Sequence, residues 1–124
     1  MGANLVEALA AAGHSARVLR RENSRLDALA GLTYEDAIGD ILDLPSLRQA
    51  MENCDWVFHV AAVSDYWRQG VDWLYQVNVE GTRRVLQAAR ECGVRRLVYT
   101  SSVAALGVSE TGELMDEGHT FNIS

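Results

Sequence analysis

The sequence contains no lysine. Its eleven basic residues are all arginine, and together with 17 acidic residues they leave a formal net charge of −6. The missing lysine excludes a P-loop nucleotide-binding enzyme, because that site needs a lysine to reach the β- and γ-phosphates. The negative charge disfavours a nucleic-acid partner, because such binding requires a basic face that displaces counterions from the phosphates.

Cysteine is also scarce, and long apolar runs are absent. The two cysteines, Cys54 and Cys92, lie far apart and outside any Cys-x-x-Cys pattern, which argues against a disulfide framework and a zinc site. We expect both to be small buried hydrophobic residues. No run approaches the roughly 18 apolar residues of a membrane span. Residues 1–7 lack the basic start and apolar core of a secretory signal, so a cytoplasmic location without a membrane span is expected.

Helical and strand patterns alternate along the chain. Apolar spacings of three and four predict helices over 3–12, 26–29, 45–51 and 71–92. Short apolar segments between them predict buried strands over 15–20, 33–38, 56–62 and 95–100, followed by an irregular tail to residue 124. These spacings suit right-handed crossover units, so we predict a doubly wound, Rossmann-like parallel α/β fold for residues 1–124. Strand 56–62 is nearly all apolar and is expected to be central and covered on both faces.

Four short motifs, in this order and at suitable spacing, carry a family resemblance. They read Gly-Asp-Ile-Leu-Asp at 39–43, His-Val-Ala-Ala at 59–62, Asn-Val-Glu-Gly-Thr at 78–82 and Tyr-Thr-Ser-Ser at 99–102. Together they resemble the extended short-chain dehydrogenases/reductases, the NAD-dependent epimerase/dehydratase family. The resemblance covers nearly the whole chain and is strongest to dihydroflavonol-reductase-like enzymes and hopanoid-associated sugar epimerases.

The resemblance implies reversible hydride transfer between a nicotinamide and a carbonyl or secondary alcohol of a small-molecule substrate, such as a sugar nucleotide or a flavonoid-like ketone. The family's catalytic tyrosine is followed four residues later by a lysine, and the chain has no lysine, so we expect negligible turnover by these 124 residues. An alternative is a non-catalytic NADP-sensing or interaction module on the same fold. A phosphoryl-receiving domain is disfavoured because an early acidic pair and a late lysine are both missing. Pairing of relatives through their long helices makes a homodimer of the complete protein plausible, with residues 71–92 contributing.

Gly2 matches the last glycine of the family's Thr-Gly-x-x-Gly-x-x-Gly loop, which follows the first strand. Glycines there allow the pyrophosphate to approach a helix N-terminus, where free N–H groups attract it. The first strand itself has no counterpart in this sequence. Because a Rossmann sheet runs in the order 3-2-1-4-5-6, we expect two separated strand pairs, a poorly stable chain and weak cofactor binding.

Arg20 and Arg21 occupy the place, about 20 residues after the glycine loop, where dinucleotide sites distinguish their cofactors. An acidic residue there would bind the ribose hydroxyls of NAD, whereas a guanidinium offers paired donors to the 2′-phosphate of NADP. NADP is therefore the preferred cofactor and NAD the possible one. Arg21 is our first choice, Arg25 could share the role, and a merely solvated strand end is the alternative.

Two further motifs are assigned to the cofactor by resemblance. Asp40 would accept a hydrogen bond from the adenine amino group, and Ile41 would pack against the adenine ring. Val60, Ala61 and Ala62 match the strand end that lines the cofactor, where small side chains let the backbone approach the ribose and pyrophosphate. An ordinary loop aspartate and a plain buried strand are the alternatives.

The last two motifs border the reacting groups in the family. Asn78 matches the asparagine whose amide holds the active-site backbone and the cofactor in place. Ser102 matches the catalytic serine or threonine that orients the substrate oxygen, while Thr100 and Ser101 border the cofactor. For His59 we expect a satisfied core residue rather than a catalyst or metal ligand, because no other ligand lies near it in the sequence.

Overall fold

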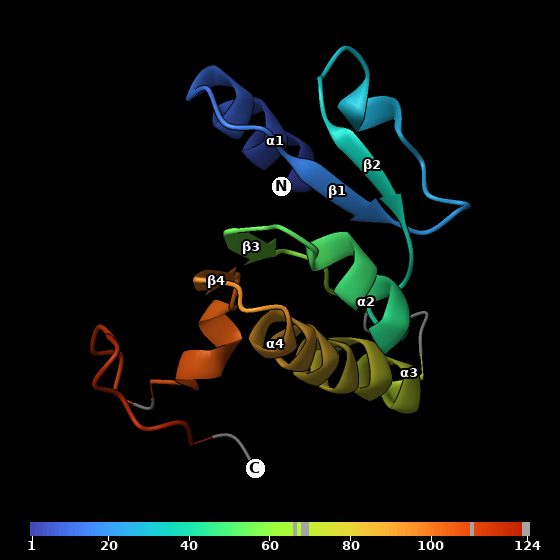
Figure 1. The fold of residues 1–124 in the computed structure, drawn as a ribbon. Helices are drawn as coiled ribbons and strands as arrows, with labels where there is room; N and C mark the ends of the chain where they lie inside the picture. The colour runs from blue at the N-terminus through green and yellow to red at the C-terminus, as the bar shows by residue number, and fades with distance from the viewer. Residues whose placement is uncertain (66, 68–69, 110, 123–124) are drawn as a thin grey trace.

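A computed structural model describes residues 1–65, 67, 70–109 and 111–122. Helices and strands alternate along the chain (Figure 1). The helices are α1 (Gly2–Ala11), α2 (Leu44–Met51), α3 (Val71–Tyr75) and α4 (Thr82–Glu91), and a π-helical segment, Gln76–Gly81, joins the last two. The strands are β1 (Arg17–Arg20), β2 (Glu35–Ile38), β3 (Trp56–His59) and β4 (Arg96–Tyr99), with short 3₁₀ helices at Asp27–Leu29 and Val103–Leu106.

The helix boundaries follow local signals in the sequence. Helices α1 and α4 are followed by Gly13 and Gly93, whose φ angles of +80° and +70° suit glycine and stop the helix. Asp43 is the N-cap of helix α2, because its carboxylate accepts a hydrogen bond of 3.3 Å from the Ser46 amide, and Pro45 occupies the first turn. These starts and stops confirm the predicted helices.

The predicted helix over 71–92 is one helical segment with an irregular turn. Within it, residues Gln76–Gly81 are π-helical. A π turn bonds each carbonyl to the amide five residues on, and such turns are often found at functional sites. Apolar spacing did not indicate this turn, because Val77, Gly81 and Val85 are all buried and keep a spacing of four through it.

The strands form two separate parallel pairs, β1 with β2 and β3 with β4. In register, Arg17 lies opposite Glu35 and Trp56 lies opposite Arg96. This confirms the expected arrangement of two separated strand pairs within the described residues. A cavity of about 930 Å³ lies between the pairs, lined by β1, β3, α1 and α2.

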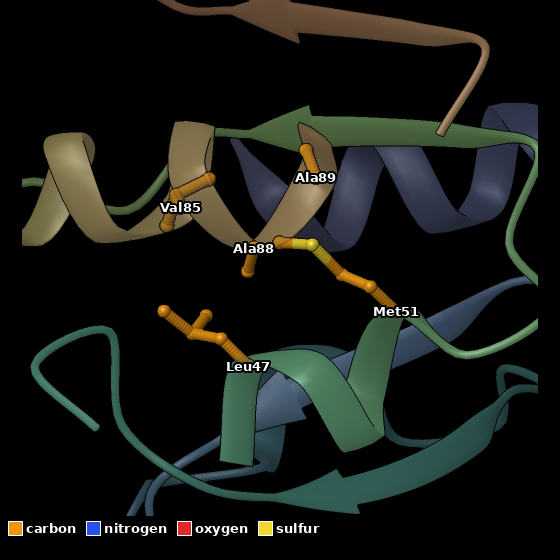
Figure 2. Packing of buried hydrophobic residues seen from close by; sticks show 5 residues of the cluster. All are labelled: Leu47, Met51, Val85, Ala88 and Ala89. Carbon is orange, nitrogen blue, oxygen red and sulfur yellow. The ribbon is translucent and has the colours of Figure 1, made fainter. Parts of the chain in front are cut away.

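The buried core lies mainly between two helices rather than within the sheet. Leu47 and Met51 of α2 face Val85, Ala88 and Ala89 of α4 (Figure 2). Partly buried residues of three strands also pack against this cluster, namely Leu19, Val57 and Leu97. Helices α2 and α4 therefore hold the two strand pairs together.

Several predictions of burial were wrong, for a common reason. Strand β3 ends at His59 rather than at Ala62, and its Trp56 is 47% exposed, so it is not covered on both faces. In β4, Tyr99 is 50% exposed. Cys54 and Cys92 are only partly buried. An apolar segment indicates a tendency towards burial, but burial also requires a neighbouring layer, and the described residues cover these faces only in part. No helix in the described part of the chain is long and apolar enough to cross a membrane.

Candidate functional site

Most of the candidate residues lie at or just after the carboxyl ends of the strands. Within each strand pair these ends lie side by side. The Gly39 amide donates a hydrogen bond of 2.9 Å to the Arg20 carbonyl, and the Thr100 amide donates one of 3.0 Å to the His59 carbonyl. The polar and small residues placed there are Arg20, Arg21, Asp40, Val60, Ala61, Ala62, Thr100, Ser101 and Ser102.

The N-terminus of α1 borders the end of β3. A Cβ on Gly2 would lie 3.6 Å from a methyl carbon of Val60, an ordinary van der Waals distance, so the two residues are neighbours here. No side chain caps the first turn of α1, and the turn contains no acidic residue. Ala61 and Ala62, just past β3, are exposed. Free N–H groups and the helix dipole make this end of α1 compatible with an anion such as a pyrophosphate.

The adjacent residues Arg20 and Arg21 differ in the contacts of their side chains. Arg20 makes a bidentate ion pair with Asp36 of β2, through Nε at 2.8 Å and Nη2 at 2.6 Å, and its Nη1 donates to the carbonyls of Arg21 and Glu22. These bonds raise the pKa of Arg20 further above its ordinary value, the hydrogen bond to Asp36 contributing most. By contrast, the Arg21 side chain is exposed and has no ion pair with any residue that the structure describes. Arg21 is therefore free to meet a ligand anion.

The loop between β2 and α2 is tightly organised around Asp40. Asp40 Oδ1 accepts a hydrogen bond of 2.8 Å from the Leu42 amide, and the Asp40 amide donates one of 3.1 Å to Ser46 Oγ. A side chain at Gly39 would collide with Ser46 Oγ at 2.6 Å. Ile41 lies against Gly81, where a Cβ would meet its Cδ1 at 2.7 Å, and this contact anchors the loop on the long helix. The adenine role of this loop stays a prediction.

Asn78 clamps the backbone just beyond β3. Its Oδ1 accepts a hydrogen bond of 2.8 Å from the Val63 amide, and its Nδ2 donates one of 2.9 Å to the Val63 carbonyl. Both polar groups of Val63 are thereby satisfied by one side chain from the π-helical segment. The sequence indicated Asn78 through its motif, but it gave no signal for Val63, because only backbone atoms of Val63 take part.

His59 is buried, with 4% of its surface exposed, and its Nε2 has a polar partner. Its Nε2 lies 2.9 Å from Thr82 Oγ1, and its ring stacks on Tyr99 with centroids 5.3 Å apart. Burial lowers the pKa of His59 below the ordinary 6.5. These contacts confirm the expected satisfied core histidine. No group of metal-ligating side chains occurs in the described residues.

The buried histidine makes stability depend on pH. Because the folded-state pKa of His59 is lowered from 6.5, the unfolded chain binds more protons between that lowered value and 6.5. We therefore expect stability to be fully present above pH 6.5 and to fall below it, by up to about 1.4 kcal/mol per pH unit. Urea midpoints measured across this range would check the slope. It should disappear in His59→Gln and persist in the exposed-site control His14→Gln; an equal slope in both variants would contradict the assignment.

Ser102 starts the 3₁₀ helix that follows β4. Its Oγ accepts a hydrogen bond of 3.3 Å from the Ala104 amide, and the residue is exposed. The hydroxyl proton remains available for a ligand oxygen. Ser101 is also exposed, whereas Thr100 is partly buried. The structure thus places these three residues just after the carboxyl end of β4, and their roles stay predictions.

Comparison with known proteins gives these features a family context. The 3-beta hydroxysteroid dehydrogenase/isomerase family matches residues 1–122. A putative dihydroflavonol 4-reductase from Synechocystis sp. is 44% identical over 119 residues, which cover 96% of this chain and 34% of that protein. The crystal structure of gox2253 superposes with a TM-score of 0.90 at 37% identity, covering 98% of this chain and 37% of that one. The NAD complex of UDP-glucose 4-epimerase from Brucella ovis gives a TM-score of 0.82 at 28% identity, covering 98% and 38% of the chains. This chain therefore spans about a third of the length of the relatives it matches.

Proposed function

Because the chain belongs to the 3-beta hydroxysteroid dehydrogenase/isomerase family, we propose that it forms part of the dinucleotide site of an NAD(P)-dependent reductase or epimerase. The whole protein would move a hydride between a nicotinamide and a carbonyl or secondary alcohol, on a sugar nucleotide or a flavonoid-like ketone. The observation that carries the proposal is the clamp by which Asn78 holds both backbone groups of Val63. The clamp fixes the backbone that continues from the exposed alanines beyond β3.

The residues at the strand ends fit such a cofactor. The uncapped N-terminus of α1 supplies N–H groups for the pyrophosphate. Arg21 supplies a free guanidinium for a 2′-phosphate, which favours NADP over NAD. Asp40 offers a carboxylate oxygen for the adenine amino group, and the small side chains of Ala61 and Ala62 leave the backbone accessible. The proposed fit thus depends on hydrogen-bond donors for the phosphate groups and on the small side chains that follow β3.

When bound, the nicotinamide would supply or accept the hydride. The chain's own part is to hold the dinucleotide and to orient the substrate oxygen through the Ser102 hydroxyl. None of the 124 residues is assigned the proton transfer, so catalysis is proposed only for the whole protein. The homodimer of the whole protein stays a prediction; its support is the exposure of Val71, Trp73 and Leu86 along the long helical segment.

Nucleotide titration of the ¹⁵N-labelled chain tests the proposed site. We expect NADPH to perturb the amides of Ala61, Ala62 and Ser101, with a dissociation constant above the micromolar range and with weaker effects from NADH. Residues 111–122 lie outside the site and serve as the internal control. Perturbations absent from the strand ends at millimolar NADPH would refute the proposal. Binding there by the complete protein without substrate turnover would favour the non-catalytic module.

A further inference from the structure

A chain of hydrogen bonds links β3 to the π-helical segment. His59 Nε2 lies 2.9 Å from Thr82 Oγ1, and Thr82 Oγ1 lies 2.7 Å from the carbonyl oxygen of Asn78. The Asn78 side chain then bonds twice to Val63. The linkage begins at the last residue of β3 and returns to the backbone four residues later, so it closes a loop around residues 60–62.

The direction of each hydrogen bond follows from the acceptor at its end. A carbonyl oxygen only accepts, so the Thr82 hydroxyl must donate its proton to Asn78. Thr82 Oγ1 must then accept from His59, which places a proton on Nε2 of the imidazole. Burial lowers the pKa of His59, and above that pKa the neutral ring carries a single proton, so its Nδ1 is unprotonated there. The linkage therefore selects one tautomer of His59.

The Asn78 carbonyl lies in the π turn and accepts a side-chain hydrogen bond from Thr82. In this turn a carbonyl bonds to the amide five residues on, rather than four as in an α-helix. Thr82 stands four residues after Asn78, and its hydroxyl reaches the carbonyl from the position that the α-helical amide would have served. The hydroxyl thus stabilises the turn that presents Asn78 to Val63.

We propose that His59 and Thr82 are positioning residues that hold the Asn78–Val63 clamp, and through it the cofactor-facing backbone of residues 60–62. The relevance of this backbone to a cofactor rests on the proposed function, but the linkage itself does not. His59 acts through Thr82 and touches no reacting atom. Its stacking on Tyr99 fixes the ring plane, so that Nε2 faces the threonine.

Imidazole ¹⁵N spectra of the histidine-labelled chain test the first half of the linkage. We expect His59 to show the protonated-Nε2, unprotonated-Nδ1 tautomer and to titrate below 6.5. Thr82→Val removes the hydroxyl but keeps the side-chain shape, and should abolish this tautomer signature. Thr82→Ser retains the hydroxyl and should restore it. The protonated-Nδ1 tautomer, or an averaged mixture of both tautomers, in the unsubstituted chain would overturn the proposal.

Hydrogen exchange at the Val63 amide tests the second half. Loss of one hydrogen bond from the linkage should accelerate exchange in Thr82→Val by about fivefold to tenfold, while Thr82→Ser exchanges like the unsubstituted chain. Equal exchange in the valine and serine variants would overturn the positioning role. If Thr82→Val loosens Val63 but NADPH perturbs no strand end in any variant, the linkage stands and the proposed function fails.

Discussion

Addition of an extended apolar peptide should make unfolding of this chain cooperative and shift it to higher temperature. The cavity of about 930 Å³ between the strand pairs has the edges of β1 and β3 on its two sides. Its lining is mostly apolar and comes from both pairs, including Val18, Leu19, Val57 and Phe58. A strand placed there would convert two small pairs into one five-stranded sheet.

The backbone of the two edges also favours a strand as the occupant. The backbone carbonyls of Ala16 and Arg20 accept hydrogen bonds from the β2 side. Because backbone groups alternate in direction along a parallel strand, the N–H and C=O groups of Arg17 and Leu19 point toward the cavity. By the same alternation, the backbone N–H and C=O groups of Trp56 and Phe58 in β3 point toward the cavity from the other side. The buried Nε of Arg17 has no hydrogen-bond partner among the described residues. Only an extended backbone offers donors and acceptors to both edges at once.

A peptide of five β-branched residues flanked by arginines is a suitable probe, followed by far-ultraviolet circular dichroism during heating. At about 100 times its dissociation constant, a ligand specific to the folded state adds about 2.7 kcal/mol, equivalent to roughly 10 °C in a chain of this size. The control is the same peptide with proline at its central position, which removes an N–H and breaks the ladder. A sharp melt without peptide, unaffected by its addition, would contradict the expectation. A midpoint that rises with chain concentration instead would show a second copy filling the cavity.

The fold was predictable where a single residue decides the local geometry. Gly13, Asp43 and Gly93 set helix ends through backbone freedom or capping, and these signals do not depend on the rest of the molecule. Burial was less predictable. Trp56 and Tyr99 lie in apolar segments, yet they are about half exposed, because burial depends on neighbouring layers that the local pattern does not report.

The sequence indicated which residues lie near the strand ends of the candidate site, but it did not indicate which side chains contact one another. The Asn-Val-Glu-Gly-Thr motif indicated Asn78, whereas the link from Thr82 to His59 depends on a strand and a helix 23 residues apart in the sequence. Likewise, no local sequence signal indicated that Arg20 would be ion-paired and Arg21 would not. That distinction arises because Asp36, on the adjacent strand, pairs with Arg20 alone.

Substitution of Arg21 should remove the preference for a 2′-phosphate. Its guanidinium is free of ion pairs within the described structure, whereas Arg25 is paired with Asp27 at 2.8 Å and Arg20 with Asp36. Charge-assisted hydrogen bonds contribute about 1.5–3 kcal/mol each. We therefore expect Arg21→Ala to weaken NADPH binding by about tenfold to a hundredfold and to leave NADH binding unchanged. Competitive titration by nuclear magnetic resonance measures both affinities, even when they are weak.

The comparison with other arginines decides between a specific contact and a general charge effect. Arg95→Ala is the matched control, because Arg95 is an exposed arginine that immediately precedes β4, at the opposite end of the strand from Thr100. It should leave both affinities unchanged. Arg20→Ala should weaken NADPH and NADH alike, because it releases the strand-end loop that Arg20 bonds to. Equal losses in Arg21→Ala and Arg95→Ala would mean that Arg21 is only a solvated strand end. A selective NADPH loss confined to Arg25→Ala would assign the 2′-phosphate to Arg25.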